Sequence, residues 1–346
     1  MKLSIQLVTW NGARYIPHLF ASLRHATIAD ATLHVLDNAS TDDTRAILEK
    51  ELSTFAIPHT FDAAMTNEGF VGGHNRLFAG YSRDDELVLL LNQDMMVEPD
   101  CFLRLVAFME NHPRAAACSP RLMRWDTTRV DGKTDTVDTL GLRVYRSGRV
   151  MDWMSGITWS EELAQTLAHG TTVYPGGERS IEVFGVSGAM PCFRVAALRG
   201  LPVSDDLIFD PHFFSYKEDV DLAWRLRLAG WKTFAVPGAV AYHDRTAASP
   251  RTVTDRSAAE QWNNKSELVQ KYSYRNHWFV VLKNTPWHAT VVWFELKKAL
   301  YLLFRAPRVL RFCFQSRKLF RRMIQERRLL TRARRVHKVE LRRWMT

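Results

Sequence analysis

The apolar run at residues 87–91, Leu-Val-Leu-Leu-Leu, constrains the fold of this chain more than any other feature. Successive aliphatic side chains point to both faces of a strand, which is typical of a parallel sheet covered by helices on both sides. Similar strands are predicted at 2–10, 33–39, 59–63, 86–92 and 115–120, and helical periodicity separates them near 14–25, 41–53, 73–82 and 99–112. This alternation predicts an α/β fold with a mostly parallel sheet flanked by helices.

The pattern becomes less regular between residues 121 and 183. Within it, residues 135–153 are predicted to form a β-hairpin, and the rest is predicted to be an insertion. A further strand is predicted at 232–243. With 346 residues, of which 46% are hydrophobic, the chain can bury a sizeable core, and general disorder is excluded.

The four cysteines are scattered and show no C-x-x-C spacing. This distribution argues against a zinc knuckle or a disulfide framework and suits a reducing compartment. The first residues, MKLSIQLVTWNG, predict a strand and a turn and lack the features of a signal peptide. We therefore expect a cytoplasmic protein.

The charge of the chain is unevenly divided. Residues 263–346 contain 21 Lys and Arg against 4 Glu, a net charge of +17, whereas the whole chain carries +10. We therefore expect two parts, a mildly acidic domain at 1–262 and a basic tail at 263–346 that binds an anionic partner. No nucleic-acid-binding motif accompanies the basic residues, so nucleic acid is the less favoured partner.

Polar side chains follow three of the predicted strands, at Thr9-Trp10-Asn11-Gly12, Asp37-Asn38-Ala39-Ser40 and Asn92-Gln93-Asp94. In open α/β sheets, ligands bind at the carboxyl ends of the strands. Asp37 is placed to accept a hydrogen bond from a base or a ribose, and a carboxylate after residue 92 can hold Mg²⁺ or Mn²⁺, which bridge phosphates. These positions favour a nucleotide-diphosphate ligand.

The segment at 67–75 is rich in glycine and leads into a helix. Glycine permits close approach of the backbone to a ligand, and the amides at a helix N-terminus suit anions. We therefore expect Asn67, Gly72 and Asn75 to contact the donor. The segment matches neither the P-loop pattern nor the dinucleotide-binding pattern, so neither a P-loop enzyme nor a dehydrogenase is indicated.

Three carboxylates, Glu218, Asp219 and Asp221, stand at the start of a predicted helix. The apolar face of this helix is indicated by residues at i, i+4 and i+7, which are Leu222, Leu226 and Ala229. Ser215 and Glu218 have the spacing of a capping box, which predicts a helix start near the acidic pair. Together with the carboxylate at residue 94, this pair favours catalysis over a simple cap.

Six segments occur in the order seen in a known family: VTWNG, LDNASTDDT, NEGFVGGHN, LLLNQDMMVEPD, GVSGAMPCFR and FFSYKEDVDLAWRLRLAGW. Over residues 3–245 the chain thus resembles glycosyltransferase family 2, in particular its bacterial rhamnosyltransferase-like members that build cell-envelope polysaccharides. The resemblance implies a GT-A fold, a nucleotide-sugar donor, a divalent metal and inversion at the anomeric carbon.

The resemblance also implies roles for single residues. Asp37 is the nucleotide-recognising carboxylate, with Thr9 and Asn11 in the same pocket. Asp94 keeps the metal-binding carboxylate of the family's D-x-D element, whereas Asn92 replaces its first carboxylate and remains able to bond ribose or phosphate.

Further along the chain, Asp219 matches the general base and Glu218 shapes the site or contacts the acceptor. His243 occupies a position close to the diphosphate or the metal. A helix N-terminus lowers the pKa of Asp219 and neighbouring carboxylates raise it, so the sequence leaves the net direction open.

The tail interleaves large aromatic residues with Lys and Arg. Its apolar stretch at 289–304 is 16 residues long and contains three charges, so it is short of the roughly 20 residues that span a bilayer. This composition suits helices in the interface of an anionic membrane. The alternatives are packing of the tail on the body or on a second subunit.

These features predict a peripheral enzyme on the inner face of the cell membrane. It would be an inverting glycosyltransferase that adds a sugar, plausibly rhamnose, to a lipid-linked or nascent polysaccharide. A nucleotidyltransferase is one alternative, although it would be expected to use a Gly-rich basic loop after the first strand, which VTWNGARY does not supply. A non-catalytic membrane-binding module is another. The tail is expected to be dispensable for donor binding by the 1–262 body.

Overall fold

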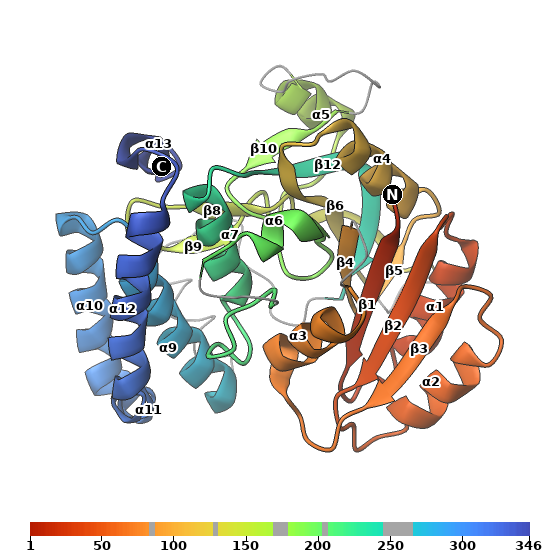
Figure 1. Cartoon of the computed structure of the whole chain (residues 1–346), viewed down its shortest axis with the longest axis horizontal. Coiled ribbons are helices and arrows are strands. Elements are labelled where there is room, and N and C mark those ends of the chain that lie inside the picture. Colours follow the sequence, from red (N-terminus) through yellow and green to blue (C-terminus); the bar gives the residue numbers. More distant parts are fainter. Residues whose placement is uncertain (83–86, 127–130, 169–178, 203–206, 245–265) are drawn as a thin grey trace.

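The computed structural model describes residues 1–82, 87–126, 131–168, 179–202, 207–244 and 266–346. In this part of the chain a ten-stranded sheet forms the centre of the molecule (Figure 1). Eight strands follow the order β10-β12-β6-β11-β4-β1-β2-β3, while β5 pairs with β12 and β7 with β6. The strands are β1 (Leu3–Thr9), β2 (Ala31–Asp37), β3 (His59–Ala63), β4 (Leu87–Asn92), β5 (Met95–Val97), β6 (Ala115–Trp125), β7 (Lys133–Thr139), β10 (Ile181–Val183), β11 (Cys192–Arg194) and β12 (Lys232–His243).

Most of the long strand pairs are parallel, with the antiparallel pair of β6 and β7 as the exception, which confirms the predicted α/β fold with its mostly parallel sheet. Strands β3, β2, β1 and β4 run parallel to one another, and so do β6 and β12. The short strand β11 lies antiparallel between β4 and β6 and joins the two parallel groups. The carboxyl ends of β1, β2 and β4 therefore lie at one edge, as the sequence predicts.

Helices cover both faces of the sheet. Alternate side chains of β4 explain why its sequence is apolar throughout: Val88 and Leu90 join a core with α3 and α7, whereas Leu87, Leu89 and Leu91 join a core with α1, α2 and α4. The helices before the tail are α1 (Ile16–His25), α2 (Thr44–Leu52), α3 (Gly69–Tyr81), α4 (Cys101–Asn111), α5 (Glu161–Ala168), α6 (Val195–Arg199) and α7 (Glu218–Leu228).

The predicted hairpin at 135–153 is smaller than expected. Strands β8 (Leu142–Val144) and β9 (Val150–Asp152) form an antiparallel pair, but β7 pairs with β6 and so belongs to the main sheet. Residues 127–130 and 169–178 of the predicted insertion lie outside the described residues.

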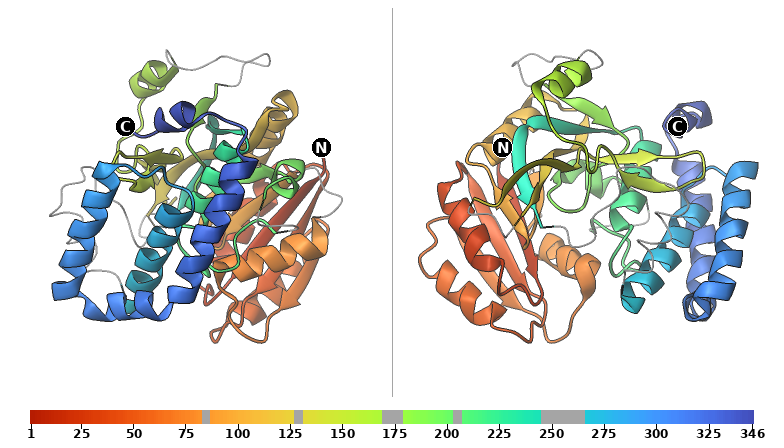
Figure 2. Two further views of the ribbon diagram at one scale, coloured as in Figure 1. Left: turned by 60° about the vertical axis from the view of Figure 1, so that its left-hand side comes forward. Right: turned by 180° about the vertical axis from the view of Figure 1, so that it is seen from behind.

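The tail is helical, with α9 (Glu267–Lys283), α10 (Ala289–Arg305), α11 (Pro307–Gln315), α12 (Arg317–Ala333) and α13 (Lys338–Arg342). Helices α9, α10 and α12 lie side by side on one flank of the molecule (Figure 2). None of the described helices is long and apolar enough to cross a membrane.

The tail helices share a hydrophobic core with the body. Phe279 of α9 and Met323 of α12 belong to the same buried cluster as Trp224 of α7. At the end of the chain, the backbone N–H of Thr346 donates to the carbonyl of Val144 (3.1 Å). The tail is therefore an integral part of the packed structure.

Candidate active site

The polar residues after β1 and β2 are held together by short hydrogen bonds. The side-chain oxygen of Asn11 accepts from the Thr41 N–H (2.8 Å), and the Asn11 N–H donates to the Ser40 hydroxyl (3.0 Å). Asp37 is buried and accepts from the same hydroxyl (2.5 Å), while the Thr9 hydroxyl donates to the carbonyl of Leu36 (3.4 Å). Thr9, Asn11 and Asp37 thus lie together, as predicted.

The glycine-rich segment is mostly helix rather than loop, which corrects the expected helix start near residue 73. Helix α3 begins at Gly69, whose positive φ of 73° favours glycine. A Cβ at Gly73 would lie 2.7 Å from the Val8 side chain, so this glycine allows α3 to pack closely on β1. Gly72 also lies within the helix, so its glycine character does not by itself indicate a phosphate-binding loop.

Two asparagines of this segment have protein partners. Asn67 accepts from the Gly69 N–H (2.8 Å) and from the Asn38 amide (3.2 Å). Asn75 is buried, and its amide makes two hydrogen bonds with the backbone of Phe209 (2.9 and 3.0 Å). The contacts of Asn75 hold α3 to the loop before α7, and donor binding by either asparagine stays a prediction.

The segment after β4 lies beside the ends of β1 and β12. Gln93 bonds both the N–H and the carbonyl of Trp10 (2.9 and 3.1 Å), and the carbonyl of Asp94 accepts from the Asp244 N–H (3.0 Å). Asn92 ends β4, and its N–H donates to the carbonyl of Ala189 (3.1 Å). The predicted residues Asn92 and Asp94 therefore stand at the same edge of the sheet as Thr9, Asn11 and Asp37.

Asp94 and His243 form a pair that suits a divalent cation. The Nε2 atom of His243 lies 3.4 Å from the Asp94 carboxylate, and Nδ1 lies 2.9 Å from the buried Asp138. A carboxylate behind a histidine orients the ring toward a metal. Burial alone would lower the pKa of His243, but the two carboxylates raise this pKa to about 10, so a cation bound at Nε2 would displace a proton.

The predicted catalytic carboxylates stand in the first turn of α7. Asp219 accepts from the N–H groups of Val220 (2.7 Å) and Gly188 (3.3 Å). The pKa of Asp219 is raised, with burial as the largest cause and the nearby Asp152 charge in the same direction. This settles the question that the sequence left open, because burial outweighs the groups that favour the ionised form.

Glu218 is more deeply buried than Asp219. Its Oε2 atom has no hydrogen-bond partner among the described residues. Burial, followed by the charge of Asp219, raises the pKa of Glu218 to about 8. The two neighbouring carboxyl groups therefore share an environment in which one of them is readily protonated.

The start of α7 is not set by the predicted capping box. The residue that precedes the helix is Lys217, and no side chain caps the helix there. Phe214, Tyr216 and Lys217 all have positive φ values, so the chain turns tightly after Ser215 and the helix begins later than a cap at Ser215 would allow. The amide of Asn276 on α9 holds this turn by donating to the carbonyls of Phe213, Ser215 and Tyr216 (2.8, 2.8 and 2.7 Å).

Helix α7 is buried on nearly all sides, so the apolar face predicted from Leu222 and Leu226 is only part of its contact surface. Asp221, the third carboxylate of the first turn, is fully buried away from solvent and pairs with Arg225 (2.8 Å) and Lys283 (3.1 Å). This carboxylate therefore joins α7 to α9.

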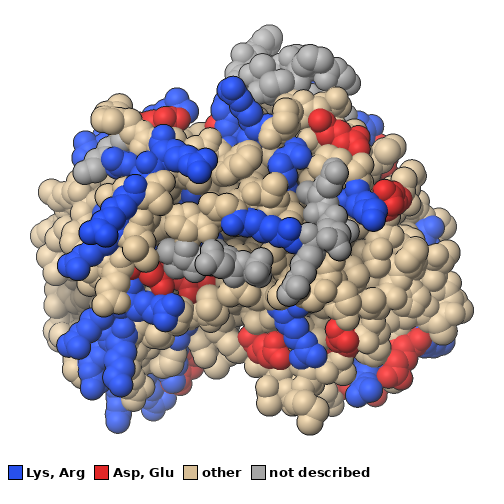
Figure 3. Space-filling model, viewed as in Figure 1, with Lys and Arg blue, Asp and Glu red and all other residues tan. Residues whose placement is uncertain are grey.

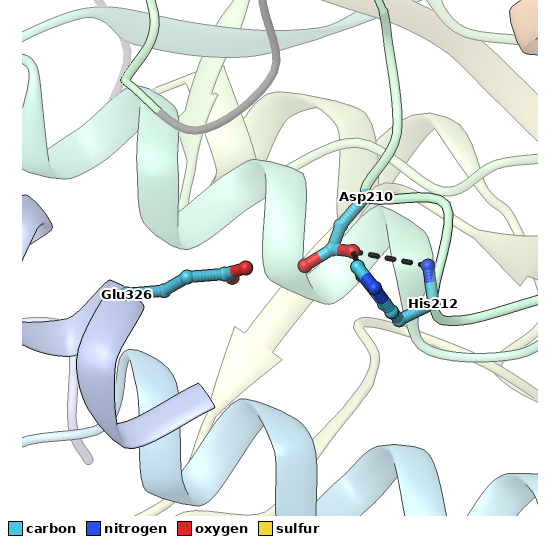
Figure 4. A group of neighbouring side chains, drawn as sticks. All are labelled: Asp210, His212 and Glu326. Carbon is cyan, nitrogen blue, oxygen red and sulfur yellow. Dashed lines mark hydrogen bonds and ion pairs between the residues drawn. The ribbon is translucent and has the colours of Figure 1, made fainter. Parts of the chain in front are cut away.

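Asp210, His212 and Glu326 converge nearby and have the spacing of a metal site (Figure 4). However, Lys283 lies 2.5 Å from Asp210 and 3.1 Å from Glu326. The ammonium group already supplies the positive charge that these carboxylates need, so we interpret the cluster as an ion-pair network. Asp94 and His243 remain the better metal candidates.

Sequence analysis missed several residues that support the site. Asp138 lies 105 positions from His243, and Asn276 lies 60 positions from Tyr216. Arg14 and Tyr15 both donate to Asp244 just after β12 (2.5 and 2.8 Å). Arg14 and Tyr15 follow the VTWNG segment, Asp244 follows His243, and Asn276 lies in a segment, 262–284, that resembles the family more weakly. Asp138 has no such neighbour.

The fold is that of the GT-A glycosyltransferases. The structure is similar to a crystal structure of GalNAc-T7 with UDP, GalNAc and Mn²⁺, with a TM-score of 0.52, 12% identity, and coverage of 82% of this chain and 50% of that chain. It also aligns with S. aureus TarS 1–349 at a TM-score of 0.47 and 16% identity, over 80% of this chain and 72% of that one.

Residues 4–183 match the family described as Glycosyl transferase family 2, and the chain belongs to this family. It is also similar to the N-acetylglucosaminyl-diphospho-decaprenol L-rhamnosyltransferase of Mycobacterium tuberculosis, with 26% identity over 281 residues, which are 78% of this chain and 85% of that protein. The protein is thus an enzyme, and a nucleotidyltransferase or a non-catalytic module no longer fits.

Proposed function

We propose that this protein is an inverting glycosyltransferase that moves rhamnose from a nucleoside-diphosphate donor to a lipid-linked saccharide of the cell envelope. The carboxylate pair in the first turn of α7 carries the proposal, because of its place next to the end of β4. The Gly188 N–H donates to Asp219, and the carbonyl of the next residue, Ala189, accepts from the N–H of Asn92. The name of the mycobacterial relative supports rhamnose and a polyprenyl-diphosphate acceptor.

In the proposed mechanism Asp219 accepts the proton of an acceptor hydroxyl. The oxygen attacks the anomeric carbon from the face opposite the diphosphate, the bond to the diphosphate breaks, and the configuration inverts. The raised pKa of Asp219 makes it a stronger base than a solvated aspartate. Its hydrogen bonds from Gly188 and Val220 hold the carboxylate in place.

The donor is proposed to bind along the ends of β1, β2 and β4. Asp37 would accept from the base or ribose, with Thr9, Asn11 and Asn92 beside it. Asp94 and His243 would hold Mg²⁺ or Mn²⁺, which when bound offsets the charge of the departing diphosphate. The enzyme would work as a peripheral protein on the cytoplasmic face of the membrane, where such an acceptor lies.

The test is a screen of nucleoside-diphosphate sugars, including rhamnose donors, with a polyprenyl-diphosphate N-acetylglucosamine acceptor. We expect acceptor-dependent nucleotide release and a product of inverted configuration, assigned by NMR. Asp219→Asn should lower turnover by about 10²–10⁴-fold while donor affinity stays near that of the wild type. Near wild-type turnover in Asp219→Asn would instead point to Glu218 as the base.

A further inference from the structure

Helix α10 carries large apolar side chains on the side that faces away from the protein. Trp293 is 67% exposed and Phe304 is 76% exposed. At about 100° per residue, six exposed apolar residues of this helix fall within one arc of about 120°, and the less exposed Tyr301 (36%) lies beyond it. The six are Val292, Trp293, Leu296, Leu300, Leu303 and Phe304, which we call the α10 face.

Two of the four charged residues within α10, Glu295 and Lys298, lie on its inner side, whereas Lys297 and Arg305 are exposed. Glu295 bonds His277 and Trp278 of α9 (2.7 and 2.9 Å) as well as Lys298 (2.8 Å). Val291 and Leu302 are buried on the same inner side. The helix is therefore anchored to α9 by polar and apolar contacts, and the α10 face is left apolar and uncovered among the described residues.

Exposed basic residues border this face. In Figure 3, Lys and Arg gather at the lower left, where Figure 1 places α11 and the adjoining end of α12. The exposed basic residues of this border are Arg305, Arg308, Arg311, Arg317 and Lys318. An apolar helical face flanked by cationic side chains matches the layered chemistry of a bilayer surface, with acyl chains beneath anionic headgroups.

We propose that the α10 face is the membrane-docking surface of this enzyme and lies in the headgroup layer of an anionic bilayer. The proposal deepens the proposed function, because a lipid-linked acceptor is met at that surface. A second copy of the chain fits the face less well, since a symmetric contact would bring the basic borders of the two copies together.

The experiment is co-sedimentation of the full-length protein with phosphatidylcholine vesicles that contain or lack phosphatidylglycerol. The triple variant Trp293→Gln, Leu300→Gln and Phe304→Gln removes three side chains of the α10 face. The matched control, Leu103→Gln, Ile157→Gln and Val339→Gln, changes three exposed apolar residues elsewhere. We expect the wild type and the control to pellet with anionic vesicles, and the triple variant to bind at least about tenfold more weakly.

Equal pelleting of the triple variant and the wild type would overturn the proposal, and so would a wild type that stays in solution with both vesicles. A wild-type dimer that the triple variant converts to monomer, without vesicle binding, would assign the face to a subunit contact instead. Pelleting needs no sugar substrate, so it is independent of the proposed transferase reaction. Nucleotide release with a soluble acceptor analogue would show separately whether that reaction occurs.

Discussion

Glu218 is a buried carboxyl group whose folded-state pKa of about 8 lies well above that of an unfolded glutamate. At pH values between these two pKa values, Glu218 keeps its proton in the folded protein and has lost it in the unfolded chain. Stability should therefore fall as pH rises from about 4.5 to about 8, and then level off. Glu218→Gln removes this dependence, and we expect it to raise the free energy of unfolding by at least about 1 kcal/mol at pH 8.

The measurement is a set of thermal melts of the wild type and Glu218→Gln from pH 5 to pH 9. The gain in melting temperature should be small at pH 5, grow up to about pH 8 and then level off. Glu162→Gln, on the exposed helix α5, is the control and should show no such trend. A difference in melting temperature between Glu218→Gln and the wild type that is the same at every pH would contradict the raised pKa of Glu218.

The pair of Asp94 and His243 predicts metal-dependent activity. A strong chelator should lower turnover by about tenfold or more, and added Mg²⁺ or Mn²⁺ should restore it. Asp94→Asn should weaken donor binding in the presence of metal, measured by calorimetry. Its donor affinity should approach that of the wild type in the presence of the chelator. Full activity with the chelator would remove the metal from the mechanism, and the His243 imidazolium would then be the cation beside the diphosphate.

At the scale of the elements, the position of α7 depends on α9. The Asn276 amide bonds three carbonyls of the turn that precedes Glu218, and this turn contains residues with positive φ. We expect Asn276→Ala to lower kcat by about 10–100-fold with little change in donor affinity, because the turn no longer holds Asp219 in place.

A control separates this effect from general loss of stability. Leu302→Ala removes a buried side chain of α10 that belongs to a different cluster, and we expect it to cost about 2–5 kcal/mol of stability. Steady-state kinetics at a temperature where both variants are folded give the comparison. If Leu302→Ala and Asn276→Ala lose kcat equally, Asn276 has no specific positioning role.

At the scale of the whole molecule, the shared core predicts that the tail is needed for folding. Removing residues 286–346 takes away five buried side chains of the cluster that contains Trp224, namely Val291, Met323, Leu330, Leu341 and Met345. At about 1.5–3 kcal/mol each, their loss amounts to about 8–15 kcal/mol, which is comparable with the whole stability of a typical domain.

We therefore expect the truncated protein to lose its cooperative thermal transition and its donor binding, in contrast to the sequence-based expectation of a separable body. Circular dichroism melts and donor calorimetry provide the measurements. The full-length protein with the three α10-face substitutions is the control and should melt like the wild type. A truncated protein that melts cooperatively and binds donor with unchanged affinity would show that the body folds alone.

The amino-acid sequence by itself determined the parallel strands and the residues at their ends. Local periodicity and apolar runs such as 87–91 identify single helices and strands, because each pattern lies within one element. The carboxyl ends of parallel strands then meet at one edge of the sheet, independently of the conformation of the loops. For this reason local patterns single out Thr9, Asn11, Asp37, Asn92 and Asp94 as candidates, whereas the choice of Asp219 as the base and the roles of the others came from the resemblance to glycosyltransferase family 2 and stay predictions.

Only the tertiary structure decided how the acidic helix begins and where the tail packs. Ser215 has the spacing of a cap, but three residues with positive φ and the Asn276 amide set the start of α7 instead. The direction in which the pKa of Asp219 shifts depends on burial. The packing of the tail depends on which side of each of its helices contacts the body. These properties arise from contacts between residues far apart in the chain, and such contacts leave no local pattern in the sequence.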